Sequence, residues 1–140
     1  VVVYDSKGDW IGVGIAEILA KSGARVTLAV NGLHVGESLQ SYVRDHTAAR
    51  IHNLGIKVIT YARAFGIDDD TVYFHHTAGG EPMIIDGVDN LVLCCGSIPN
   101  VSPEDEDRWL NLPVTLLGDC LAPRTAEEAV YDGLKYAMDI

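Results

Sequence analysis

The first thirty residues, VVVYDSKGDWIGVGIAEILAKSGARVTLAV (Val1–Val30), contain the pattern that decides the fold. The β-branched run Val1–Tyr4 is typical of a buried parallel strand. Apolar residues then recur at helical spacing, Gly23 is placed to end a helix, and Arg25–Val30 has the composition of a second strand. The order strand, turn, helix, strand predicts the βαβ unit of a dinucleotide-binding domain.

The following residues extend this unit. We expect a helix between Ser38 and Leu54, a third parallel strand at Ile56–Thr60 and a further buried strand at Val88–Cys95. Between the last two lie short alternating segments separated by turn residues, which predict an antiparallel β-meander. These segments are Ala62–Ile67, Thr71–His75 and Pro82–Ile85. The predicted fold class is therefore α/β, a Rossmann-like three-layer domain with a central parallel sheet, flanking helices and an antiparallel β-meander.

The last forty residues have a different organisation. We expect a short helix at Glu104–Leu110, a last strand at Val114–Leu117 and a final helix that begins at the capping box Thr125–Glu128. The predicted buried side of that helix contains Ala129, Leu134, Ala137 and Met138. We place a degenerate dinucleotide-binding domain at residues 1–100 and the loop, last strand and helix at residues 101–140, packed as one unit.

Composition excludes several classes of function. The chain has 140 residues, of which 48% are hydrophobic, so one buried core is expected. Its formal net charge of −10 disfavours nucleic acid and anionic membranes as partners. No apolar run is long enough to span a membrane and no signal-peptide pattern occurs, so we expect a soluble, cytoplasmic protein.

Reactive side chains do not form a recognisable catalytic or metal-binding constellation. The three cysteines, Cys94, Cys95 and Cys120, fit a reducing compartment, and we interpret them as buried thiols, the adjacent pair on opposite faces of a strand. His75 and His76 would also point apart. We therefore predict no metal site and no catalytic residue.

The sequence also predicts which side chains of the first helix are buried. Ile11, Ile15, Ile18 and Leu19 form one apolar face, and Trp10 is expected to pack over the start of the helix.

The dinucleotide fingerprint is damaged at the turn after the first strand. In G-x-G-x-x-G the glycines permit a tight turn, close approach of the pyrophosphate and helix packing. Here Gly12 takes the third place and Gly8 lies four residues before it. Asp5 and Asp9 would each repel a pyrophosphate by about 1 kcal/mol at 4 Å in water and about 4 near a protein surface.

The second half of the fingerprint is also incomplete. The second strand ends without the carboxylate that binds the adenosine ribose, and Asn31 offers only an uncharged hydrogen bond. We predict a Rossmann-like scaffold whose nucleotide site is lost, with Gly8, Gly12 and Asn31 as the residues nearest to it.

Specific segments resemble known flavoproteins. VVVY, AEILAKSGARVTLAV, HNLGIKVI and VDNLVLCCGSIPN resemble the nicotinamide-binding domain of the disulfide-reductase class. The closing TLLGDCLAPRTAEEAVYDGLKYA is similar to the C-terminal flavin motif of the multidomain NADH:flavin oxidoreductases. That family includes 2,4-dienoyl-CoA reductase and the trimethylamine, dimethylamine and histamine dehydrogenases.

The resemblance implies a larger parent protein. Its members carry an FMN barrel with an iron–sulfur cluster, followed by a region that binds FAD or, in the amine dehydrogenases, ADP. Gly118 and Asp119 would belong to the FAD or ADP half, beside the N-terminus of the last helix, where anions are favoured. The barrel and the rest of the FAD/ADP domain would be its partners, with a separate electron-acceptor protein; homo-oligomerisation stays open.

Two functions remain as alternatives. In the first, the chain is a non-catalytic module of an amine-dehydrogenase-like flavoprotein, with a structural, ADP/FAD-binding or electron-transfer docking role. The degraded turn favours this function, because an amine dehydrogenase takes electrons from its substrate and not from NADPH. In the second, the chain is the NAD(P)H-binding domain of an NADH:flavin oxidoreductase or enoate reductase and binds the cofactor through backbone donors.

Overall fold

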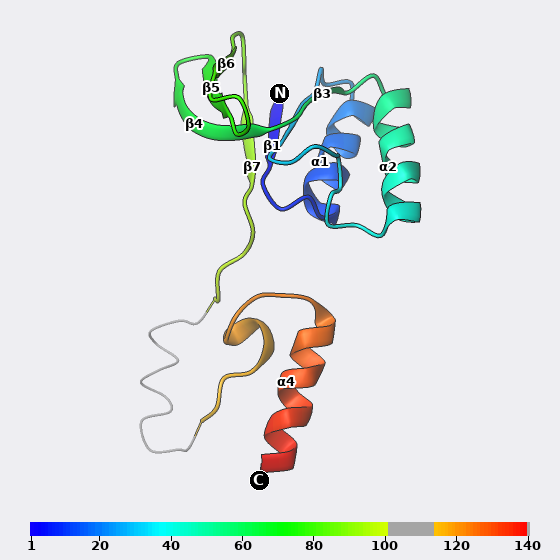
Figure 1. The fold of residues 1–140 in the computed structure, drawn as a ribbon, viewed down its shortest axis with the longest axis vertical. Coiled ribbons are helices and arrows are strands. Elements are labelled where there is room, and N and C mark those ends of the chain that lie inside the picture. Colours follow the sequence, from blue (N-terminus) through cyan, green and yellow to red (C-terminus); the bar gives the residue numbers. More distant parts are fainter. Residues whose placement is uncertain (101–113, 140) are drawn as a thin grey trace. The chain divides into compact units, whose positions relative to one another are not determined.

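The computed structural model describes residues 1–100 and 114–139, which belong to two compact units (Figure 1). Unit 1 comprises Val1–Gly96 and unit 2 comprises Ser97–Ile140. The helix expected at Glu104–Leu110 falls outside the described residues.

A parallel sheet forms the centre of unit 1. Its strands follow the order β3-β2-β1-β7, and every neighbouring pair is parallel. The strands and the two helices that connect them are β1 (Val2–Asp5), α1 (Trp10–Lys21), β2 (Thr27–Val30), α2 (Ser41–Asn53), β3 (Lys57–Ile59) and β7 (Leu91–Cys94). The βαβ unit expected from the first thirty residues is confirmed, although β7 begins at Leu91 and not at Val88.

The predicted meander is present as a second sheet. It consists of β4 (Ala62–Asp68), β5 (Thr71–His76) and β6 (Pro82–Ile85), paired antiparallel in the order β4-β5-β6. A bulge interrupts the register of β4 between Ala64 and Gly66.

Two cores lie on opposite faces of the parallel sheet. On the helix side, Val3 and Leu28 are fully buried with Val13 and Ala16 of α1. On the other side, Val2 and Tyr4 pack with Phe74 of the meander, and the rings of Tyr4 and Phe74 are 5.7 Å apart. Figure 1 shows α1 and α2 side by side and the meander as a separate group of strands. This arrangement confirms the Rossmann-like three-layer fold.

The apolar face predicted for α1 is only partly buried. The helix contacts the sheet through Gly12, Val13 and Ala16, whereas Ile11 and Ile18 are 53% and 69% exposed. Small residues allow the helix axis to approach the sheet closely, which leaves the larger isoleucines on a flank that the described residues do not cover. The packing expected for Trp10 is also wrong, since its side chain is 60% exposed.

Unit 2 contains the 3-10 helix η1 (Gly118–Cys120) and the helix α4 (Ala126–Asp139). The strand expected at Val114–Leu117 is absent: the backbone at Leu117 is extended, but no described strand pairs with it. The buried side expected for α4 is also absent, because none of its residues is buried. Both differences have one cause, since a strand and an amphipathic helix need a neighbouring element to pair with or pack on.

The cysteines correct a further expectation. Cys94 is buried in the helix-side core, but Cys95 and Cys120 are exposed, and all three are free thiols. Cys94 and Cys95 differ in exposure because neighbouring residues of an extended strand face opposite ways.

Candidate nucleotide site

The turn between β1 and α1 is built around the carboxylate of Asp5. Asp5 is the last residue of β1 and is 1% exposed. Its Oδ1 accepts hydrogen bonds from the backbone N–H groups of Gly8 at 2.8 Å and Lys7 at 3.0 Å. In a dinucleotide-binding βαβ unit the donors of this turn face the pyrophosphate. Here an internal carboxylate occupies them.

The two glycines of the damaged fingerprint serve this arrangement. Gly8 has a φ of +64°, a left-handed conformation that lets the chain turn back toward Asp5. Gly12 lies in the first turns of α1, where an added Cβ would be 2.5 Å from Cγ of Asp5. Gly12 therefore allows close helix packing as the fingerprint requires, but the helix packs on a carboxylate.

The electrostatics of the turn oppose a second anion. Oδ2 of Asp5 is buried and has no hydrogen-bond partner among the described residues. Burial raises the pKa of Asp5 above its ordinary value of 3.8, against the opposing effect of the bonds from Gly8 and Lys7. Asp9 caps α1 by accepting from the N–H of Ile11 at 2.9 Å. Internal carboxylates thus satisfy three of the donors at this end of α1.

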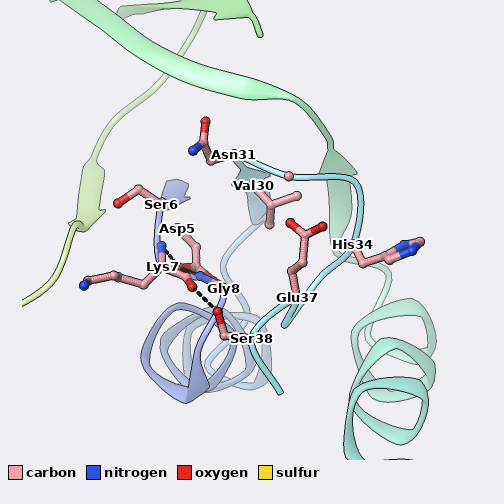
Figure 2. A pocket seen from close by; sticks show the side chains of 10 residues that line it. Asp5, Ser6, Lys7, Gly8, Val30, Asn31, His34, Glu37 and Ser38 are labelled. Atoms are coloured by element: carbon pink, nitrogen blue, oxygen red, sulfur yellow. Dashed lines mark hydrogen bonds between the residues drawn. The ribbon is translucent and has the colours of Figure 1, made fainter. Parts of the chain in front are cut away.

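The basic residue in the turn, Lys7, lines the crevice but is directed away from the Glu37 carboxylate. The side chain of Lys7 extends over Gly96, where an added Cβ would be 2.7 Å from Cε of Lys7. Figure 2 shows its amino group pointing away from Glu37 and His34.

A ten-residue loop, residues 31–40 between β2 and α2, folds back over the turn. The Oγ of Ser38 donates to the carbonyl of Lys7 at 2.7 Å, and the N–H of Ser38 donates to the carbonyl of Gly8 at 2.9 Å. Figure 2 shows the first of these bonds beside Gly8. The loop therefore closes one side of the crevice in which a dinucleotide would lie.

Glu37 places a further carboxylate at the end of β2. A Cβ added to Gly32 would be 1.5 Å from Oε2 of Glu37, so this oxygen lies against the Gly32 backbone. Figure 2 shows the Glu37 carboxylate turned toward Val30. Asn31, expected to make an uncharged hydrogen bond to a ribose, is at the end of β2 and exposed.

Sequence reasoning missed Glu37 and Ser38 because both come from the loop after β2 and not from the strand itself. One signal was available. Loops between a strand and a helix in α/β units usually have about 2–6 residues, and a loop longer than that suggests a role of its own.

The space left between these groups is small. The cavity has a volume of about 130 Å³ and includes Gly8, Asn31 and Glu37 in its lining. Sites for cofactors and drug-sized ligands have about 300–1,000 Å³. The crevice therefore offers a dinucleotide a small and acidic space, in which Asp5 already occupies the N–H groups of Lys7 and Gly8.

The other two predicted site residues lie in unit 2. Gly118 is buried, has a φ of +58°, and an added Cβ would be 3.1 Å from Cβ of Ala129. Oδ1 of Asp119 accepts from the N–H of Arg124 at 3.4 Å, one residue before the capping box. One of the two bonds of the predicted capping box is present, because Glu128 accepts from the N–H of Thr125 at 3.0 Å. The Thr125 hydroxyl donates to the same carboxylate.

The structure thus brings Gly8 and Asn31 to one cavity, whereas Gly12 lies beneath it against Asp5. Gly118 and Asp119 form a separate turn before α4. In the part of the chain that the structure describes, no three His, Cys, Asp or Glu side chains are grouped to hold a metal ion. Within the same residues, no helix has the length and apolar content to cross a membrane.

Comparison with known proteins identifies the architecture. No protein-family model and no curated protein matches the chain. Among solved structures, histamine dehydrogenase from Rhizobium sp. 4-9 matches with a TM-score of 0.86 and 23% identity. The match covers 99% of this chain and 22% of that one. The chain resembles the multidomain NADH:flavin oxidoreductases.

Two further structures support this resemblance. The 6-hydroxypseudooxynicotine amine oxidase of Pseudomonas geniculata matches with a TM-score of 0.85 and 21% identity, over 98% of this chain and 21% of that chain. A 2-naphthoyl-CoA reductase matches with a TM-score of 0.76 and 28% identity, over 99% of this chain and 21% of that chain. The resemblance predicted from the sequence is confirmed, and the chain spans about a fifth of the length of these proteins.

Proposed function

We propose that these residues are a non-catalytic module of a larger flavin-dependent oxidoreductase that oxidises an amine. The observation that carries the proposal is the filling of the nucleotide crevice by the chain's own carboxylates, Asp5 and Glu37. A reductase needs this crevice to receive a hydride donor. An enzyme that takes electrons from an amine does not need it.

The names of the matched proteins support the same conclusion. Two are named as acting on amines, a histamine dehydrogenase and an amine oxidase, and they match with the higher TM-scores. The third, named as a reductase, matches with a lower TM-score but higher identity.

Uncovered apolar faces support the role of a module. In unit 1, Trp10, Ile11 and Ile18 of α1 are more than half exposed. In unit 2, Leu134 and Met138 of α4 are 58% and 78% exposed. Large apolar surfaces of this kind are usually covered by another domain or chain.

In the parent protein, unit 2 would complete a site for ADP or FAD. Gly118 and Asp119 are our candidates, because the resemblance places these two residues, just before α4, beside the ribityl or ribose part of the nucleotide. FMN and an iron–sulfur cluster would be held by other domains. The acidic stretch Glu104–Asp107, outside the described residues, would serve the docking of a basic electron acceptor.

The alternative, an NAD(P)H-binding domain of a reductase, has less support. It depends on free backbone donors in the β1–α1 turn, and the N–H groups of Lys7 and Gly8 already bond to Asp5.

The parent enzyme provides the test. The full-length flavoprotein that contains these residues is mixed anaerobically with histamine, as a representative small amine, or with NADPH, and its flavin absorbance is followed. We expect an amine, and not NADPH, to bleach the flavin. Rapid bleaching by NADPH with no response to a panel of small primary, secondary and tertiary amines would contradict the proposal.

A further inference from the structure

The turn between β5 and β6 is closed at His76, the last residue of β5. The four residues that follow, 77–80, include the pair Gly79–Gly80. Glycine has little conformational preference of its own, so the order of this turn depends on its hydrogen bonds. The backbone N–H of His76 donates to the carbonyl of Glu81 at 2.9 Å, and the N–H of Gly80 donates to the carbonyl of His76 at 2.9 Å. These two bonds join the ends of the turn.

A third bond of the turn depends on a titratable side chain. The N–H of Gly79 donates to Nδ1 of His76 at 2.7 Å. A neutral imidazole has one nitrogen that accepts a hydrogen bond and one that carries the proton, so the proton of neutral His76 lies on Nε2. Nδ1 is therefore the nitrogen that takes up a second proton, and it is the one that Gly79 occupies.

A carboxylate lies ready to receive a protonated Nδ1. Oε1 of Glu81 is 3.7 Å from Nδ1 of His76, and the same carboxylate lies against the backbone of Gly79. The imidazole is 23% exposed, so water can bring a proton to it. The other titratable ring that faces it belongs to Tyr61, whose centroid is 5.1 Å away.

The neighbouring strand β4 places an uncharged residue beside His76. Ala62 pairs with His76 and is fully buried. Arg63 pairs with His75, and because neighbouring residues of a strand face opposite ways, this second pair lies on the other face of the sheet. Glu81 is therefore the charged group that a proton on His76 would meet.

Tyr61 joins this turn to the loop that closes the crevice. Its carbonyl accepts from the N–H of Thr77 at 2.8 Å, and its own N–H donates to the carbonyl of Gly32 at 2.9 Å. Its φ of +54° is a left-handed conformation that is rare for a bulky residue, so the bonds on its two sides hold it in place. The turn after β5 is thus two backbone hydrogen bonds away from the loop at residues 31–40.

We propose that protonation of His76 opens the turn between β5 and β6. A proton on Nδ1 would face the N–H of Gly79, donor against donor, and the two nitrogens cannot stay 2.7 Å apart. The imidazolium then donates to the Glu81 carboxylate, and the N–H of Gly79 is released to water. Histidine side chains ordinarily titrate between about pH 5 and 8, so the turn is closed near the upper limit and open near the lower one.

Amide hydrogen exchange of the 140-residue chain tests the proposal. Exchange is followed by NMR between about pH 5 and 8, and each rate is compared with the intrinsic rate at that pH. The protection of the Gly79 amide should fall about three- to tenfold toward the acid limit, the loss expected for one hydrogen bond. Nitrogen-15 NMR of the imidazole should place the proton of His76 on Nε2 at about pH 8.

Variants of His76 separate the effect of the proton from that of the side chain. In His76→Asn an amide oxygen can accept from Gly79 at every pH, so the protection of Gly79 should not depend on pH. In His76→Ala the acceptor is absent, and protection should be low at every pH. His75→Gln, on the other face of the sheet, is the matched control and should keep the pH dependence of the wild type.

Glu81→Gln tests the partner of the imidazolium. The variant removes the charge that receives the protonated Nδ1, so the fall in Gly79 protection should move about 0.2–0.7 pH unit lower.

Protection of Gly79 that does not change over this pH range would overturn the proposal. A proton on Nδ1 in the closed turn, or a wild-type pH dependence in His76→Asn, would also overturn it, as would a fall at higher pH in Glu81→Gln. The proposal does not depend on the proposed function, because it concerns the meander and not the nucleotide crevice or the flavin.

Discussion

Asp5 determines the chemistry of the β1–α1 turn. A carboxylate tethered by its own backbone reaches the N–H groups of Lys7 and Gly8 without the entropy cost that a free phosphate would pay on binding. The sequence showed that Asp5 would repel a pyrophosphate. It did not show that the side chain would bond to the turn and fit beneath Gly12, because that depends on the path of the turn.

Asp5→Asn tests the cost of the buried charge. Asn keeps an oxygen for Lys7 and Gly8 and removes the negative charge, so the variant should be about 1 kcal/mol more stable at pH 7. Because the pKa of Asp5 is raised in the folded state, the folded state binds the proton more tightly. The free energy of unfolding of the wild type therefore falls as pH rises from 3.8 through the raised value.

The advantage of Asp5→Asn should accordingly be larger at pH 7 than at pH 4. Urea unfolding of both proteins at the two pH values measures it, and the difference cancels the effects of the other carboxylates. An advantage that does not change with pH would contradict a raised pKa at Asp5.

Gly12 and Gly14 form a matched pair on α1. In Gly12→Ala the new Cβ would meet Asp5, and we expect a loss of about 1–3 kcal/mol. In Gly14→Ala no atom lies within 4 Å, and helix propensity should add about 0.5–1 kcal/mol. Chemical denaturation measures both, and equal effects of the two substitutions would contradict the close packing of α1 on Asp5.

Among the elements, those with a clear local period were predicted correctly. The β-branched run of β1, the helical spacing of α1 and the alternation of the meander each carry their own signal. The loop at residues 31–40 has no such period. Its position depends on the bonds of Ser38 to Lys7 and Gly8, more than 29 residues away in the chain, which no local pattern reveals.

Gly118 and Gly133 test the packing of η1 on α4. Gly118 has a positive φ and an added Cβ would crowd Ala129, so Gly118→Ala should weaken this contact by about 1–2 kcal/mol. At Gly133 no atom lies within 4 Å, and Gly133→Ala should strengthen α4. Amide hydrogen exchange in α4 should become faster in the first variant and slower in the second. Unchanged exchange in Gly118→Ala would contradict the contact.

At the scale of the whole molecule, the order of strands and helices along the chain predicted the three layers. It did not predict which apolar surfaces stay exposed. An amphipathic pattern shows that Ile11, Ile18 and Leu134 form apolar faces; it cannot show whether the covering element belongs to the same domain. For the same reason the sequence predicted a buried side for α4 that the described residues leave open. The sequence predicted where the candidate site lies and that it has lost its nucleotide. It did not predict the Glu37 carboxylate or the loop that closes one side of the site.

Calorimetric titration of the chain with NADH and NADPH at pH 7 tests the central claim, that internal carboxylates have replaced the dinucleotide. We expect no binding heat up to about 1 mM of either cofactor. A dissociation constant in the micromolar range for NADH or NADPH would contradict the claim.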